Sequence, residues 1–125
     1  MILGLGIDIV EIERIRRAVE RFGERFLHRA LTDEEWSAFV NYAHPFPHYA
    51  GRFAAKEAVM KALGTGWGGG VGWQQIVVTN RPSGEPQVEL RGAAAERLKQ
   101  LGGKRVLVSI SHSQHYAVAV AIVEG

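Results

Sequence analysis

The sequence contains no cysteine, only four prolines, and almost no excess of charge of either sign. Without cysteine the chain can form neither a disulfide framework nor a thiolate zinc site. Fifteen basic and thirteen acidic residues give a formal net charge of +2, which is weak evidence for a nucleic-acid partner. No apolar run is long enough to span a bilayer, and Asp8, with no basic stretch before it, argues against a signal peptide. These absences favour one domain over residues 1–125, located in the reducing cytoplasm and stabilised by packing.

The hydrophobic pattern predicts an α+β fold, with a mainly antiparallel sheet packed with helices. Apolar residues alternate over residues 2–10, which is typical of a strand with Asp8 near its end. From Glu11 the period becomes helical, and Gly23 is well placed to end that helix. Thr32 with Glu35 suggests a capping box for a second helix.

The second helix is expected to end at Pro45 and Pro47, because proline breaks a helix interior. Four glycines within residues 67–73 leave that stretch without an expected regular structure. The remaining pattern predicts a central helix over 49–63 ending at Gly64, a hairpin of strands 76–79 and 87–90, a helix over 93–101, and strands over 105–111 and 116–123.

Two acids and a lysine form the first candidate site. Asp8 lies near the end of a predicted strand, while Glu57 and Lys61 lie four residues apart on one face of the central helix. Two carboxylates can hold magnesium together with substrate phosphate oxygens, and a lysine can neutralise one of those oxygens. On spacing alone, an ordinary exposed pair between Glu57 and Lys61 is the simpler interpretation.

A second candidate site combines Arg52 and Lys56, which lie four residues apart, with Gly64 and Thr65 at the helix end. Cations and backbone amides together can bind phosphate, although no P-loop motif is present. Phe53 can stack on a base, but an aromatic at helical spacing is more often part of the core.

The segment Ser111–Ser113 offers further donors at a strand end. His112 and its flanking serines can contact phosphate or ribose, and His112 can act as a general base. The sequence lacks the G-x-S-x-G motif of a nucleophile elbow, which gives a serine hydrolase little support. A strand end with a hydrogen-bonded histidine is the simpler alternative.

Arginines on the first predicted helix form a basic stripe. Arg14, Arg17 and Arg21 share one face, with Arg16 and Arg25 nearby. The stripe can be a solvated surface or can dock an acidic partner. A nucleic-acid partner is not expected, because no recognised motif accompanies the stripe.

Four segments together resemble the holo-acyl-carrier-protein synthase family. They are GIDIVEIERI at 6–15, AGRFAAKEAVMKALGTG at 50–66, SGEP at 83–86 and SISHS at 109–113. The resemblance implies a 4′-phosphopantetheinyl transferase fold. It also implies a magnesium-dependent transfer of 4′-phosphopantetheine from coenzyme A to a serine of acyl carrier protein, releasing adenosine 3′,5′-bisphosphate, by a homotrimer with active sites between subunits.

The resemblance also implies a role for individual residues. Asp8 and Glu57 match magnesium ligands, and Lys61 matches the lysine beside the diphosphate. The positions that match coenzyme contacts are Arg52, Phe53, Lys56, Gly64, Thr65, Pro86, His112 and Ser113. Arg14 and Arg21 match residues that dock the acidic carrier, and helical spacing adds Arg17. The resemblance leaves the general base open; we expect Glu57, directly or through a metal-bound water, and His112 is the alternative.

Three departures from the family pattern leave local roles open. Gln75 and Val77 stand where an acidic W-x-D-I-E pattern is expected, the loop Gly68–Gly72 is unusually rich in glycine, and Glu85 replaces a common lysine. Two other functions also stay open, a non-enzymatic basic module that binds an acidic protein or nucleic acid, and a metal-dependent hydrolase of coenzyme A or a nucleotide.

Overall fold

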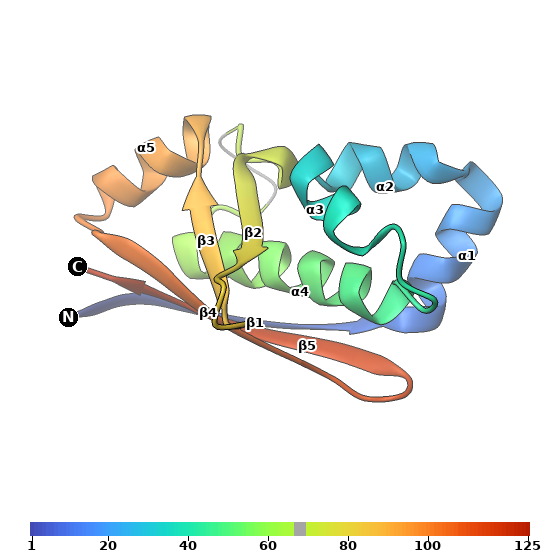
Figure 1. Cartoon of the computed structure of the whole chain (residues 1–125). Helices are drawn as coiled ribbons and strands as arrows, with labels where there is room; N and C mark the ends of the chain where they lie inside the picture. Colours follow the sequence, from blue (N-terminus) through green and yellow to red (C-terminus); the bar gives the residue numbers. More distant parts are fainter. Residues whose placement is uncertain (67–69) are drawn as a thin grey trace.

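Two antiparallel sheets carry the strands in the computed structural model, which describes residues 1–66 and 70–125 (Figure 1). The first sheet has the order β1 (Ile2–Glu11), β5 (Tyr116–Glu124), β4 (Arg105–His112). The second sheet is the hairpin of β2 (Ile76–Asn80) and β3 (Pro86–Leu90). The predicted α+β class, the order of the strands along the chain and the hairpin are therefore confirmed.

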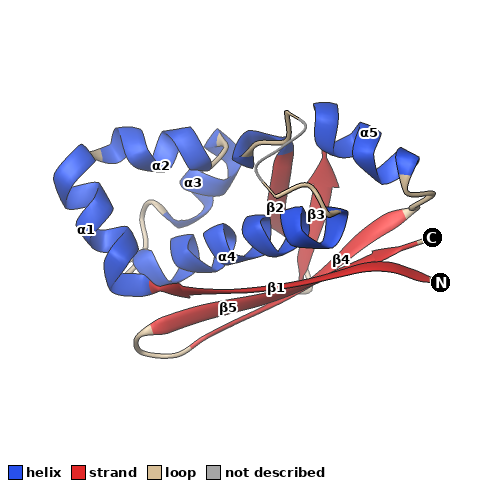
Figure 2. Cartoon of the chain, turned by 180° about the vertical axis from the view of Figure 1, so that it is seen from behind, coloured by secondary structure: helices blue, strands red, loops and turns tan. Residues whose placement is uncertain are grey.

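The central helix α4 (Phe46–Leu63) lies across one face of the three-stranded sheet. Figures 1 and 2 show it between that sheet on one side and the hairpin with α2 (Glu24–Ala30) and α3 (Asp33–Phe39) on the other. Its contact with β1 is very close, since a Cβ at Gly6 would lie 2.0 Å from the carbonyl oxygen of Ala58. Glycine is therefore required at this position to let α4 approach the strand.

The remaining helices follow local signals in the sequence. They are α1 (Ile12–Phe22), the short 3₁₀ helix η1 (Trp73–Gln75) and α5 (Gly92–Gln100). Gly23 ends α1 with a φ of 75°, a conformation that favours glycine. Thr32 and Glu35 form the predicted capping box at the start of α3, with both reciprocal hydrogen bonds present.

Three local predictions differ from the structure. The prediction that Pro45 and Pro47 end the second helix is wrong, because α3 ends at Phe39 and Pro47 lies in the first turn of α4. Proline fits a first turn because the amide it lacks has no partner there. Helix α2 was not predicted, and the glycine-rich loop prediction falls partly on residues 67–69, which lie outside the described residues.

Small side chains allow the core to form around α4. Ala54, Ala55, Ala58 and Ala62 of the helix are buried, and so are the alanines of β5 that face it. In the described part of the chain, no helix is both long and apolar enough to cross a membrane.

Candidate active site

Asp8 and Lys61 meet where α4 crosses β1. The Nζ of Lys61 lies 3.1 Å from Oδ1 of Asp8, and it also donates to the backbone oxygen of Ile7 at 2.9 Å. The side chain of Lys61 remains 53% exposed. The surface pair of Glu57 and Lys61 that spacing alone favours is therefore not the observed arrangement, because Lys61 reaches across to the strand.

Glu57 is half-buried on α4, one turn before Lys61. Its Oε1 accepts a hydrogen bond from Nε1 of Trp73 at 3.0 Å. Burial raises the pKa of Glu57 and the charge of Asp8 raises it further, while the Trp73 hydrogen bond and Lys61 oppose this shift. The two carboxylates are thus close enough to repel each other, which is an arrangement that a cation would relieve.

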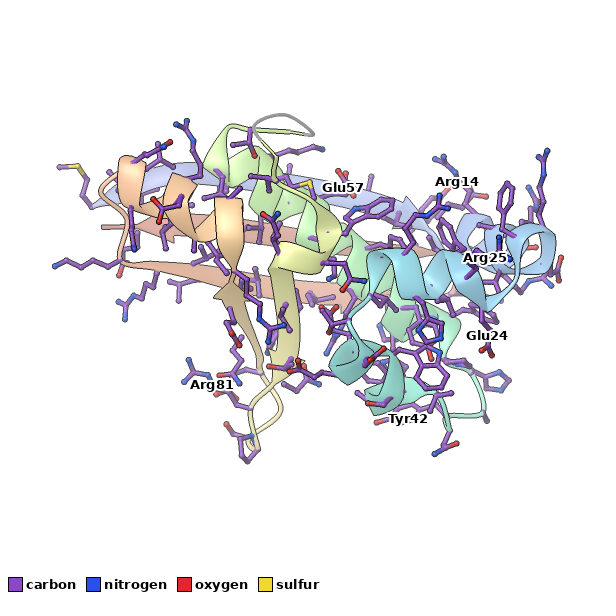
Figure 3. All side chains as sticks on the ribbon, turned by 90° about the horizontal axis from the view of Figure 1, so that it is seen from above. Arg14, Glu24, Arg25, Tyr42, Glu57 and Arg81 are labelled. Carbon is purple, nitrogen blue, oxygen red and sulfur yellow. The ribbon has the colours of Figure 1, made fainter. Side chains whose placement is uncertain are left out.

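A pocket of about 440 Å³ contains both carboxylates. Arg14 of α1 lies on its wall, and Figure 3 shows Glu57 and Arg14 along the same edge of the molecule. Phe26 and Trp73 also line the pocket, and the sequence analysis assigned neither to it. No signal in the sequence could have placed Phe26 here, since it lies on the unpredicted helix α2. The pocket combines acids, one arginine and apolar walls.

The end of α4 places Gly64 and Thr65 just beyond Lys61. Gly64 adopts a left-handed conformation with a φ of 75°, and its amide bonds back to the helix. Thr65 is partly buried and lines a separate pocket beside α5. Lys61, Gly64 and Thr65 therefore gather at one helix end, whereas the sequence grouped Gly64 and Thr65 with Arg52 and Lys56, which lie further back along α4.

Lys56 is fully buried and forms an ion pair with Glu35 of α3 at 2.7 Å. Its ammonium also donates to the backbone oxygens of Trp73 at 2.8 Å and Ile76 at 2.7 Å. Burial lowers the pKa of Lys56, and the charge and hydrogen bond of Glu35 oppose that shift. The predicted coenzyme contact of Lys56 stays a prediction, since in this structure the ammonium is occupied inside the core.

Arg52 and Phe53 are also buried, with 6% and 4% of their surface exposed. Arg52 donates to Oδ1 of Asn80 at 2.6 Å and lies over the ring of Phe39, but its Nε is buried without a hydrogen-bond partner. Phe53 stacks on Phe26 at 5.3 Å between ring centroids and lines the acidic pocket. Phe53 therefore packs in the hydrophobic core, and its stacking on a nucleotide base stays a prediction.

His112 and Ser113 lie exposed at the end of β4. The ring of His112 lies 5.5 Å from that of His48, a residue that the sequence analysis did not select. Burial, together with the charges of His112 and Arg52, lowers the pKa of His48. His48, His112 and Arg52 thus lie at this end of α4, away from the acidic pocket. Figure 3 shows Tyr42, which contacts His48, on the opposite edge of the molecule from Glu57.

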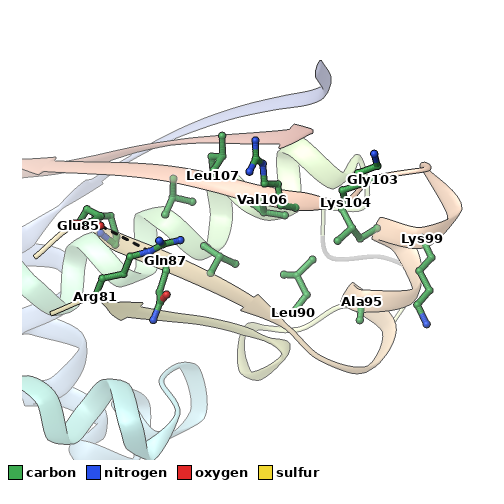
Figure 4. A pocket seen from close by; sticks show the side chains of 15 residues that line it. Arg81, Glu85, Gln87, Leu90, Ala95, Lys99, Gly103, Lys104, Val106 and Leu107 are labelled. Carbon is green, nitrogen blue, oxygen red and sulfur yellow. Dashed lines mark ion pairs between the residues drawn. The ribbon is translucent and has the colours of Figure 1, made fainter. Parts of the chain in front are cut away.

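Pro86 lies in a larger pocket of about 710 Å³ between β3, β4 and α5 (Figure 4). Glu85 pairs with Arg81 at 4.0 Å on its rim. The two carboxylates and Arg14 lie in the smaller pocket and not in this one. Glu85 stands where a lysine is common in the family, so this position lacks a cation. Arg81, Lys99 and Lys104 nevertheless keep the rim of the pocket basic.

The α1 arginines divide into paired and unpaired groups. Arg16 and Arg17 form ion pairs with Glu13, the latter at 3.6 Å. Within the described residues, no ion pair involves Arg14 or Arg21. Both are exposed, so they have guanidinium groups available for a partner.

Two glutamines near the expected acidic pattern have structural partners. Nε2 of Gln74 donates to the carbonyls of His28 and Leu31, each at 2.8 Å. Gln75 donates to the oxygen of Gly70 at 2.9 Å and accepts from the amide of Ala94, in the first turn of α5, at 3.0 Å. An amide can make both bonds of Gln75, whereas an ionised carboxylate could only accept.

The whole chain is similar to a family of known proteins. A family model described as the 4′-phosphopantetheinyl transferase superfamily matches residues 4–121. The chain is 48% identical over 124 residues to the holo-[acyl-carrier-protein] synthase of Koribacter versatilis, covering 99% of each chain. Its structure is similar to that of the Neisseria meningitidis enzyme of the same name, with a TM-score of 0.91, 38% identity and full coverage of both chains. It is also similar to the Helicobacter pylori enzyme in complex with coenzyme A, with a TM-score of 0.84 and 34% identity over 96% of this chain and 99% of that one.

Proposed function

The chain belongs to the 4′-phosphopantetheinyl transferase superfamily, among the holo-acyl-carrier-protein synthases, and from this premise we propose how its residues perform the reaction. The enzyme transfers 4′-phosphopantetheine from coenzyme A to a serine of apo acyl carrier protein. The serine oxygen bonds to the β-phosphorus, and the bond from that phosphorus to the bridging oxygen breaks. Adenosine 3′,5′-bisphosphate leaves with the bridging oxygen.

The observation that carries the assignment of residues is the acidic pocket at the crossing of β1 and α4. Asp8 and Glu57 line it together, and Lys61 touches Asp8 at 3.1 Å. A carboxylate pair beside an exposed ammonium matches the needs of a substrate that carries a diphosphate.

Asp8 and Glu57 would hold magnesium, because two carboxylates suffice when water and substrate phosphates supply the other ligands. The donor set fits this group, since the two carboxylates repel each other and lie in one pocket. When bound, the ion would offset charge on the diphosphate and orient it.

Lys61 would exchange its contact with Asp8 for a phosphate oxygen of coenzyme A. Its ammonium is exposed and held by an ion pair that solvent can screen, so this exchange costs little. Glu57 would accept the proton of the carrier serine, because its carboxylate lies in the pocket that Arg14 borders. His112 is the alternative base, but it lies exposed at the end of β4.

Arg14 and Arg21 would dock the acidic carrier protein, since neither is neutralised by an acid in the described ion pairs. Arg17 should contribute less because Glu13 already pairs with it at 3.6 Å. Arg21→Glu is expected to raise the KM for carrier by about tenfold at low salt, with little change for coenzyme A. Arg17→Glu is the matched control, and an equal effect of both variants would contradict this docking surface.

The residues that match coenzyme contacts form two separate groups in one chain. Lys61, Gly64 and Thr65 lie at the C-terminal end of α4, whereas Arg52 and His112 lie toward its other end. The buried Nε of Arg52 lacks a partner, which suits an anionic ligand that approaches on that side. A homotrimer in which each active site combines one group from each of two subunits would unite them.

The open face of the three-stranded sheet supports such an assembly. Leu5, Ile7 and Ile9 of β1 are 66%, 60% and 64% exposed, and the register places them beside Ile122, Val120 and Val118 of β5. No described helix covers this face in Figure 1. Apolar surfaces of this kind mark protein contacts, and the subunits would pack through it.

Subunit mixing tests the shared site. Asp8→Ala and His112→Ala should each abolish or strongly reduce transfer, but an equimolar mixture that exchanges subunits should regain about a quarter of wild-type activity. Native mass spectrometry would report the trimer, and Ile7→Glu should convert it to monomers. Failure of the mixture to regain activity, with exchange demonstrated, would show that each subunit holds a complete site.

Intact-mass analysis of apo acyl carrier protein tests the reaction itself. Incubation with the enzyme, coenzyme A and magnesium should add one phosphopantetheine, and a chelator or Asp8→Ala should prevent it. Release of free phosphopantetheine without carrier would instead indicate a hydrolase. A folded sample that binds coenzyme A but modifies no carrier would favour a binding module. A cytoplasmic location stays a prediction, which fractionation would check.

A further inference from the structure

Glu57 depends on a residue outside its own helix for its orientation. The lysine one turn further along, Lys61, directs its ammonium to Ile7 and Asp8 of β1. The hydrogen bond that holds the Glu57 carboxylate comes from Nε1 of Trp73 at 3.0 Å, and Trp73 begins η1.

Trp73 is itself fixed by the buried ion pair. Its backbone oxygen accepts from Nζ of Lys56 at 2.8 Å, and Glu35 holds that ammonium at 2.7 Å. The indole ring packs edge-on against Phe53, with 5.6 Å between ring centroids. A chain of contacts therefore runs from α3 through Glu35, Lys56 and Trp73 to Glu57.

The residues after Trp73 anchor the same segment from two further directions. Gln74 bonds to the carbonyls at the end of α2, and Gln75 bonds to the first turn of α5. These contacts leave η1 little freedom to turn the indole away from Glu57.

We propose that Trp73 is a positioning residue that orients Glu57 toward the shared cation and substrate site through its indole N–H. This inference rests on the proposed function of Asp8 and Glu57. An indole is a neutral donor, so it can fix one carboxylate oxygen without offsetting the negative charge that a cation needs. An arginine or lysine in its place would compete with the cation. Hydrogen-bond donors that contact a metal ligand, and not the metal itself, commonly control both the orientation of that ligand and the affinity for the metal.

Trp73→Phe removes the N–H and retains an aromatic ring against Phe53. It should weaken Mn²⁺ binding to the coenzyme-free enzyme by about tenfold, measured from the free-ion signal in electron paramagnetic resonance. The same variant should require a higher magnesium concentration for half-maximal transfer. Trp36→Phe, which alters a partly buried indole beside His28, is the matched control and should bind Mn²⁺ like the wild type.

The variant Asp8→Ala tests the proposed metal site independently of the role of Trp73. If Asp8→Ala binds Mn²⁺ as well as the wild type, the proposed metal site is wrong. If Asp8→Ala loses Mn²⁺ binding but Trp73→Phe does not, the metal site stands and the positioning role of Trp73 is overturned.

A second measurement covers the case in which Trp73→Phe does not fold. In the unaltered enzyme, magnesium should shift the ¹⁵N-indole resonance of Trp73, assigned through its contact with Phe53, and leave that of Trp36 in place. Saturation with magnesium without any shift of the Trp73 resonance would overturn the proposal.

Discussion

Two lysines on α4, five positions apart, each pair with one carboxylate in very different surroundings. Lys56 has no exposed side-chain surface and lies 2.7 Å from Glu35, which is equally buried. Lys61 has a 53% exposed side chain and lies 3.1 Å from Asp8. Distance alone does not separate the two pairs, but burial does.

The difference assigns each pair a role. A buried ion pair is costly to break, because the remaining charge has neither water nor partner. An exposed pair contributes little to stability and can exchange its partner for a ligand. Lys56 with Glu35 therefore holds η1 in place, and the exposed pair of Lys61 with Asp8 can exchange partners, as its proposed contact with substrate requires.

The largest expected effect is on stability when the buried pair is broken. Lys56→Met should lower the free energy of unfolding by about 3–5 kcal/mol, because the buried Glu35 carboxylate would lose its cationic partner. Urea-induced unfolding measures this change. A loss below about 1 kcal/mol, similar to that for an exposed pair, would remove the distinction between the two lysines.

Lys61→Met should give the opposite result. Its free energy of unfolding should change by less than about 1 kcal/mol, since the pair is exposed. Its kcat for transfer should fall about 10²- to 10³-fold, because one cation beside the diphosphate is lost. Lys99→Met is the control for loss of an exposed lysine, since the Lys99 side chain on α5 is 76% exposed. Near-normal kcat in Lys61→Met would exclude a role in the reaction.

Gly6→Ala should disturb the exposed pair while sparing the buried one. The added Cβ would lie 2.0 Å from the carbonyl oxygen of Ala58, so β1 and α4 must separate at a cost of about 1–3 kcal/mol. Asp8 lies two residues further along the same face, so transfer should also weaken. Gly72→Ala, which meets no atom within 4 Å, is the control. Equal unfolding energies and rates for both variants would contradict this account.

The smallest expected effect is the salt dependence of the two pairs. At low ionic strength, Lys61→Met should differ from the wild type in unfolding energy by at most about 1 kcal/mol. In about 1 M salt this difference should vanish, since the Debye length is then about 3 Å. The destabilisation by Lys56→Met should persist, because salt does not reach the core. Equal salt sensitivity would place both pairs in the same surroundings.

Local signals in the sequence predicted most elements of the fold. Alternating apolar residues placed β1, and a helical period with Gly23 placed α1. These local signals gave a wrong helix boundary where one residue type is compatible with two different positions in a helix. Pro47 can break a helix interior or occupy a first turn, and only the three-dimensional course of the chain selected the second.

The candidate site was only partly accessible to the same reasoning. Residue type and position grouped Asp8, Glu57 and Lys61 as one candidate site and similarity to a family supported the choice, but helical spacing by itself paired the wrong two residues. The partners of Lys56 and Glu57 come from α3 and η1, distant in sequence, so no periodic pattern could reveal them. Residues that orient others through space are therefore found only from the structure.

The close crossing of β1 and α4 also determines when the site can form. Asp8 and Lys61 are 53 positions apart in sequence, and the strand that pairs with β1 is β5, the last element in chain order. Contacts between distant segments form late, because closing long loops costs entropy. During synthesis the strand that carries Asp8 emerges first but acquires its partner last. Catalytic competence should therefore appear only when folding is nearly complete, which makes transfer activity a sensitive reporter of the fully folded chain.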